Sequence, residues 1–265
     1  MRRRDFLVAA GSLLLPFPVH ASAIRDVRAD AGVAEAVLLQ ALLGARYRLL
    51  GEIHDNEAHH RIRARLLDAL GRAGLKPAVA FEQFDAEYDI ALQELLSSGK
   101  STANAVAEAV RFDRKGWNWQ FYRPIVEAAL EHGMPLRAAN LSRARAREAP
   151  VEAWPAEKEK ILGELIFEGH CRALPRSALP RMVAAQRARD RQMAETLLRP
   201  SADGAVLIAG NGHVRLDVGV PAYLPREGVV SVGFLEAAPA GRVPFDYTWV
   251  TAPAARPDPC AKLLK

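Results

Sequence analysis

The chain has 265 residues, of which 50% are hydrophobic and 25% are charged, as expected of a globular protein with a sizeable core. Its 36 Lys and Arg outnumber its 31 Asp and Glu, so the net charge is +5. This excess is mild and includes no long basic run, so the sequence does not indicate a nucleic-acid partner.

The first 23 residues have the three parts of an export signal. Arginines at 2–4, followed by Asp-Phe-Leu, fit a twin-arginine signal, an apolar run covers 8–17, and Ala21-Ser22-Ala23 fits a cleavage site. The apolar run is shorter than the roughly 20 residues that span a membrane, and no Cys stands at the cleavage site for a lipid anchor. We therefore expect a periplasmic or secreted protein, exported by the twin-arginine route without a permanent membrane anchor.

The remaining residues, 24–265, are expected to form a single α/β domain, because a chain of this length commonly folds around one core. Apolar runs typical of buried strands occur at 47–50, 78–81, 136–139, 206–209, 229–234 and 247–250. Helical patterns occur at 57–73, 86–97, 102–110, 120–132, 156–168 and 179–198. The alternation predicts a three-layer fold, a mostly parallel sheet with helices on both faces, and the last two strands are expected to form an edge hairpin.

Polar residues follow four of the predicted strands. Glu52 and His54 follow the first, Glu82 the second, Asn140 the third, and His213 follows the fourth within a Gly-flanked turn. In sheets of this type the ligand site lies beyond the carboxyl ends of the strands. The sequence therefore predicts that these side chains collect at one edge of the sheet.

Two carboxylates and two imidazoles in that set suit two kinds of chemistry. Glu52 and His54 are two residues apart, so on an extended strand end they point to the same side. With Glu82 and His213 they could ligate Zn or Fe with an open water position, or supply a metal-free base that activates water. The alternative is structural, with the carboxylates capping helices and the histidines binding backbone groups.

The chain has two cysteines, Cys171 and Cys260. In an oxidising compartment, two cysteines far apart in sequence are more often bridged than free, so we expect one disulfide that ties the Pro-rich C-terminal tail to the domain. Two unpaired thiols remain the alternative, since sequence spacing does not establish that the two residues are close.

Two further segments have features of a ligand pocket. The segment 116–122 holds Trp117 and Tyr122 among dense aromatics, which either fill the core or line a pocket for a flat ligand such as haem. The helix at 179–198 carries Gln186, Arg189 and Asp190, and its pattern alone favours an ordinary amphipathic helix. No C-x-x-C-H motif is present, which excludes covalent c-type haem.

The chain resembles the ChaN-like family of haem-binding uptake proteins over nearly all of residues 24–265. The resemblance is carried by five segments: LGEIHDN at 50–56, FEQ at 81–83, HCRALP at 170–175, MVAAQRARD at 182–190 and AGNGHVR at 209–215. It implies a haem or iron-binding protein of the periplasm, in haem and iron uptake, in which a tyrosine ligates the haem and Gln186, Arg189 and Asp190 support the site. The aromatic surroundings of Tyr122 favour it as that ligand and Trp117 as a pocket residue, with Tyr88 and Tyr223 as the alternative tyrosines.

The resemblance also extends to a wider superfamily and implies a second activity. The ChaN-like family is similar to erythromycin esterases and to Tiki and TraB proteins, which implies a hydrolase in which Glu52, His54, Glu82 and His213 activate water or bind metal. Some ChaN-like members pair around two haems, which implies a homodimer. The missing lipobox Cys departs from the lipoprotein members of the family. A third interpretation is an interaction domain in which these residues are structural.

Overall fold

The computed structural model describes residues 23–258 and 260–261, so residues 1–22 of the predicted export signal lie outside the described residues. The described chain forms one eight-stranded sheet, in the order β2-β1-β8-β7-β3-β6-β4-β5. The strands are β1 (Ala23–Asp26), β2 (Ala31–Val33), β3 (Tyr47–Leu50), β4 (Ala78–Asp85), β5 (Leu136–Asn140), β6 (Ala205–Ile208), β7 (Val229–Leu235) and β8 (Tyr247–Val250).

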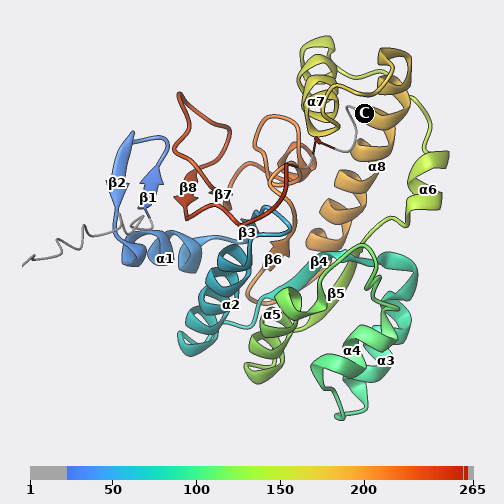
Figure 1. Cartoon of the computed structure of the whole chain (residues 1–265). Helices are drawn as coiled ribbons and strands as arrows, with labels where there is room; N and C mark the ends of the chain where they lie inside the picture. The colour runs from blue at the N-terminus through green and yellow to red at the C-terminus, as the bar shows by residue number, and fades with distance from the viewer. Residues whose placement is uncertain (1–22, 259, 262–265) are drawn as a thin grey trace, which may run out of the picture.

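Helices connect most of the parallel strands, as Figure 1 shows. They are α1 (Glu35–Gly44), α2 (Glu57–Arg72), α3 (Asp89–Ser97), α4 (Ala103–Ala109), α5 (Trp119–Glu131), α6 (Arg143–Glu148), α7 (Ala156–Gly169) and α8 (Leu179–Leu198). Short 3-10 turns are η1 (Ala86–Tyr88), η2 (Arg176–Ala178) and η3 (Val220–Tyr223). The predicted helices at 57–73 and 179–198 agree with α2 and α8 to within one residue.

Alternate residues of the strands pack into two separate hydrophobic cores, one on each face of the sheet. Leu50, Phe81 and Ile208 pack with residues of α1 to α5, whereas their neighbours Leu49 and Leu207 pack against α8 and η3. Because both faces are covered, β3, β6 and the first part of β4 are buried throughout, and every position in them except Arg48 is apolar. This confirms the predicted three-layer α/β fold with helices on both faces.

An edge hairpin is present, but it is not formed by the predicted strands. The last two strands, β7 and β8, pair in parallel, with Val232 opposite Tyr247. The connection at 236–246 is longer than a hairpin turn and returns the chain to the starting end of β8. The hairpin instead consists of β1 and β2 at the sheet's edge, where β1 also pairs antiparallel with β8. The prediction of a C-terminal hairpin was therefore wrong.

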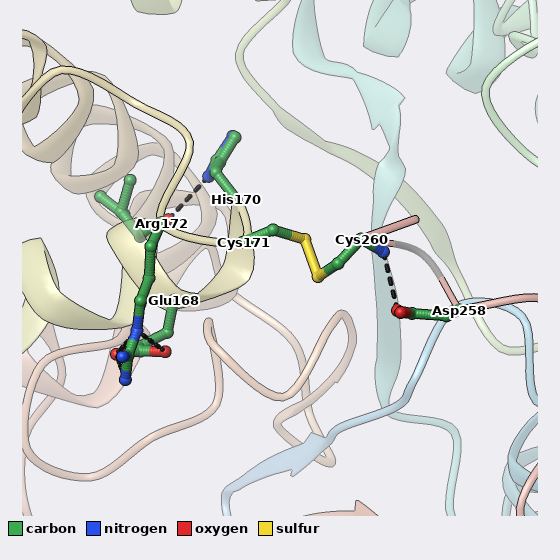
Figure 2. The surroundings of a disulfide bond; sticks show 7 residues. Glu168, His170, Cys171, Arg172, Asp258 and Cys260 are labelled. Carbon is green, nitrogen blue, oxygen red and sulfur yellow. Dashed lines mark hydrogen bonds and ion pairs between the residues drawn. A yellow bond between two sulfur atoms is a disulfide. The ribbon is translucent and has the colours of Figure 1, made fainter. Parts of the chain in front are cut away.

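The predicted disulfide is confirmed. Cys171, just past the end of α7, is bonded to Cys260 in the C-terminal tail, with their Cα atoms 5.5 Å apart and a separation of 89 positions in the sequence (Figure 2). The bond ties the tail to the helical layer formed by α7 and α8. Within the described residues, no helix is long and apolar enough to cross a membrane.

Candidate functional site

The loop after β3 places Glu52 and His54 in direct contact. The Glu52 side chain is buried, and its Oε1 lies 2.6 Å from Nδ1 of His54. A carboxylate only accepts hydrogen bonds, so we assign the ring proton to Nδ1, which leaves Nε2 of His54 as an acceptor. Carboxylate and imidazole thus form the pair that the two-residue spacing predicts.

Three side chains of α2 bind the three loop residues Glu52, Ile53 and His54. Nδ1 of His59 accepts the N–H of Ile53 at 3.0 Å, and Nε2 of His60 donates to the carbonyl of His54 at 3.0 Å. Arg63, which is fully buried, forms an ion pair with Oε2 of Glu52 and donates to Nδ1 of His60. Burial lowers the pKa of both histidines to about 4, so both are neutral.

Tyr122 lies beneath the same carboxylate. Its side chain is fully buried, and its hydroxyl donates to Oε1 of Glu52 at 2.6 Å. Burial raises the pKa of this phenol above its ordinary value, with the charge of Arg63 acting in the opposite direction. Nε2 of Gln83 lies 3.5 Å from the same oxygen. For Tyr122 to serve as the predicted axial ligand, it would have to lose both its proton and its contact with Glu52.

A second polar cluster forms on the α8 side of the sheet. Nε2 of His213 lies 3.3 Å from Oε1 of Glu82, and its Nδ1 lies 2.5 Å from Oδ1 of Asp190. Gln186 lies within 3.2 Å of both ring nitrogens of His213. The other Glu82 oxygen accepts the backbone N–H of Gly210 at 2.7 Å. The sequence-predicted Glu82, Gln186, Asp190 and His213 thus meet, although they come from three parts of the chain.

Charge pairing determines the protonation of this second cluster. Burial alone would lower the pKa of His213, but Glu82 and Asp190 on either side outweigh that effect and raise it to about 10. Burial disfavours ionised Glu82, but its interactions with His213 hold its pKa well below the ordinary range. Burial raises the pKa of Asp190 to about 6. At neutral pH the cluster therefore contains an imidazolium between two carboxylates.

The two clusters adjoin at Gly210. A Cβ atom on this residue would lie 2.7 Å from Cε1 of His54 and 3.6 Å from Oε2 of Glu82. The ring of His54 therefore occupies the space beside the Gly210 backbone, at the carboxyl edge of the sheet. This contact makes Glu52, His54, Glu82 and His213 parts of one continuous site, in agreement with the strand-end prediction.

His54 is the member of the site that reaches the surface. Its side chain is 47% exposed, and its ring lies edge-on to Trp117 with the centroids 4.6 Å apart. No described residue hydrogen bonds its Nε2, and partial desolvation lowers the pKa of the ring, with the charges of Glu82 and Asp55 acting in the opposite direction. Trp117 also lines an open hollow of about 430 Å³ formed by residues 114–120, which include Arg114 and Lys115.

Two other predicted features of the site are a supporting role for Arg189 and a metal ion shared by Glu52, His54, Glu82 and His213. Arg189 lies next to Asp190 on α8 and influences the cluster through its charge, with no described hydrogen bond or ion pair to the site. In the described part of the chain, no three His, Cys, Asp or Glu side chains are placed to hold a metal ion together. The carboxylate of Glu52 contacts His54, Arg63 and Tyr122, whereas Glu82 and His213 contact each other and His213 contacts Asp190, so these atoms do not point to a shared centre.

Sequence reasoning did not assign His60 and Arg63 to the site. The signal for His60 and Arg63 is their spacing of three residues, which puts them on one face of α2 directly after the strand-end loop. A face that presents an imidazole and a guanidinium towards a buried carboxylate is expected to bind it. That carboxylate is Glu52.

Comparisons with solved structures identify proteins of similar fold. The structure of "Cofacial heme binding to ChaN of Campylobacter jejuni" superposes with a TM-score of 0.76, at 23% identity, over 89% of this chain and 99% of that chain. At this identity the likeness shows the fold. A mutant of the erythromycin esterase EreC in its open conformation (TM-score 0.48, 15% identity, 87% of this chain and 83% of that one) is too distant to support an argument.

Sequence comparison gives the family. No curated protein matches the chain significantly. A family model described as "Haem-binding uptake, Tiki superfamily, ChaN" matches residues 38–224, which include both polar clusters of the site and the hollow beside Trp117. The chain belongs to this ChaN family of haem-binding uptake proteins.

Proposed function

We propose that this protein binds haem at the exposed edge of the site, with Nε2 of His54 as the axial ligand to the iron. The observation that carries the proposal is a half-exposed imidazole whose Nδ1 is held by buried Glu52 and whose Nε2 has no described partner. Metal-ligating histidines typically bind a carboxylate through their second nitrogen, which fixes the ring and raises its basicity. When bound, haem supplies an iron that takes such a ligand.

The surroundings of His54 fit a flat, anionic cofactor. The hollow of about 430 Å³ beside it falls within the usual range for small-molecule sites. Trp117 both lines the hollow and contacts the ring of His54, and Arg114 and Lys115, which also line the hollow, are suited to carboxylate groups such as haem propionates. These features support His54 over Tyr122, which lies buried beneath Glu52.

The cellular role that we propose is haem or iron uptake in the periplasm. It is supported by the family description and by the twin-arginine pattern of the first 23 residues. The similar protein from Campylobacter jejuni is described as binding haem cofacially. We propose that haem likewise brings two copies of this chain together, which light scattering with and without haemin would detect as a doubling of mass.

Replacement of His54 with Ala is expected to weaken haemin binding by more than about tenfold, because the iron loses its axial nitrogen and loss of a residue that only orients a metal ligand already costs about 10–100-fold. The measurement is a haemin titration followed at the Soret band. The fold is expected to persist, since the ring is half-exposed. His170→Ala serves as a control, because His170 is exposed and lies at the end of α7. Equal affinity of the wild type and the His54 variant would exclude His54 as the ligand.

The export route has its own test. Replacement of Arg3 and Arg4 with Lys is expected to leave the precursor in the cytoplasm, because the twin-arginine machinery reads the arginine pair. Cell fractionation and immunoblotting measure the outcome. Undiminished delivery of the variant to the periplasm would contradict this route.

A second candidate function is water-activating hydrolysis of an ester or amide. The specific observation in its favour is the buried Glu82–His213–Asp190 cluster next to His54, because clusters with strongly shifted pKa values are concentrated at active sites. In that case neutral His54 would accept a proton from water through Nε2. Ester hydrolysis that is lost in His54→Ala, without haemin binding by the wild type, would favour this function.

A further inference from the structure

The C-terminal tail passes directly over the loop that carries His54. Nε2 of His59 lies 2.9 Å from Oγ1 of Thr251, and the Asn56 side chain donates to the carbonyl of Ala252 at 3.0 Å. Further along, Nε of Arg256 donates to Asp55 at 2.7 Å. Each of these contacts joins the tail to the segment between His54 and the first turn of α2.

Glu236, which follows β7, fastens the tail to the sheet. Its carboxylate accepts hydrogen bonds from both terminal nitrogens of Arg256, at 2.8 and 2.5 Å, and from the backbone N–H of Ala254 at 2.8 Å. It also accepts from Asn56 at 2.7 Å. The Arg256 and Glu236 side chains are only 24% and 16% exposed, so this bidentate pair is less screened than an ordinary surface ion pair.

The far end of the tail is covalently attached to the opposite side of the site. Cys260 is bonded to Cys171, past the end of α7, as Figure 2 shows. Helix α7 lies beside α8 (Figure 1), and Leu162 of α7 belongs to the same apolar cluster as Val183 of α8. Helix α8 also carries Gln186 and Asp190 of the second polar cluster. The tail therefore connects the His54 loop to the helical layer that holds His213.

We propose that this tail, residues 251–258 and 260, is a disulfide-anchored clasp that positions His54, so that ligand affinity at the site depends on the redox state of Cys171 and Cys260. Arg256 is the positioning residue, because it acts on His54 through Asp55. The ligand part of the proposal rests on the proposed haem function. The tail residues of the clasp lie beyond residue 224, where the match to the family model ends, whereas Cys171 lies within the matched range.

Breaking the disulfide that anchors the tail to the end of α7 requires a dithiol reductant. The dithiol transfers two electrons and two protons, the Cys171–Cys260 bond breaks into two thiols, and the reductant becomes a disulfide. Both cysteines are partly exposed, so a small dithiol such as dithiothreitol can reach them. Without the bond, the tail is held, among the described residues, by the contacts of Thr251, Ala252 and Arg256 with the loop and by those of Ala254 and Arg256 with Glu236.

Hydrogen exchange tests the clasp without any ligand. Backbone amides of residues 51–57 are expected to exchange about tenfold faster in the reduced protein, in Cys171→Ser/Cys260→Ser and in Arg256→Ala, because local opening of the loop becomes easier. Arg61→Ala is the matched control, since Arg61 pairs with Glu57 on the exposed face of α2. Circular dichroism checks that each variant is folded. Unchanged exchange at 51–57 in the reduced wild type would overturn the clasp.

Haemin titration of the oxidised and reduced wild type then tests the redox dependence. We expect the reduced protein to bind haemin several-fold more weakly than the oxidised protein. If both forms bind haemin with the same affinity, although the loop exchanges faster in the reduced form, the proposed redox control of affinity is wrong. If the oxidised wild type binds no haemin, the proposed function fails, whereas the exchange result still decides whether the clasp positions the loop. The two failures are therefore distinguishable.

Discussion

Replacing Glu52 with Ala is expected to lower the free energy of unfolding by about 3–5 kcal/mol, because removal of one partner of a buried ion pair leaves the other charge uncompensated. That charge is Arg63, which has no exposed surface. Tyr122 and His54 would lose their shared acceptor in the same variant. Urea denaturation, followed by circular dichroism, measures the change.

Two further variants separate the ion pair from general damage to the protein. Glu57→Ala removes an exposed carboxylate from the same region and is expected to change stability by less than about 0.5 kcal/mol. Combining Glu52→Ala with Arg63→Met is expected to recover part of the loss, because the buried charge is then also removed. If the double variant is less stable than Glu52→Ala alone, the unpaired arginine is not the cause.

The pH dependence of stability is expected to report on His213. A group whose folded pKa is raised stabilises the fold fully below its unfolded pKa, and that stabilisation is lost as the pH rises towards the folded value. For His213 the folded pKa is about 10, against 6.5 for an ordinary histidine. The free energy of unfolding should therefore fall between pH 6.5 and about 10, by on the order of a few kcal/mol.

Neighbouring carboxylates do not obscure this window. Glu82, with its lowered pKa, changes its contribution below its ordinary value of 4.5, and Asp190 changes its contribution between its ordinary value of 3.8 and about 6. A His213→Gln variant, whose side chain does not titrate, should lose most of the alkaline slope in urea midpoints measured across the window. A wild type and variant with the same slope would show that His213 is not a buried cation.

The parts of the fold that sequence predicted were those where burial alone determines the pattern. Strands covered on both faces appear as short apolar runs, so β3 matches its predicted range, and α8 matches its helical pattern. Two helices and the hairpin were not predicted. α1 is apolar almost throughout and gives no helical period, and β1 and β2 are too short to show strand alternation.

The strand-end rule predicted where polar side chains gather, because parallel strands bring their following loops to one edge of the sheet. It brought Glu52, His54, Glu82 and His213 together correctly. It could not show where each lone pair points, and so it suggested a shared metal where the structure pairs these side chains with Arg63 and Asp190. Aromatic density at 116–122 likewise could not separate half-buried Trp117, beside the hollow, from fully buried Tyr122 in the core.

The most direct test of the proposed function is a crystal structure of the protein with haemin bound. We expect the iron to be bonded to Nε2 of His54, with the porphyrin against Trp117 and its carboxylates towards Arg114 and Lys115. A haem bonded to Tyr122, or bound elsewhere on the chain while Nε2 of His54 remains free, would contradict the proposal.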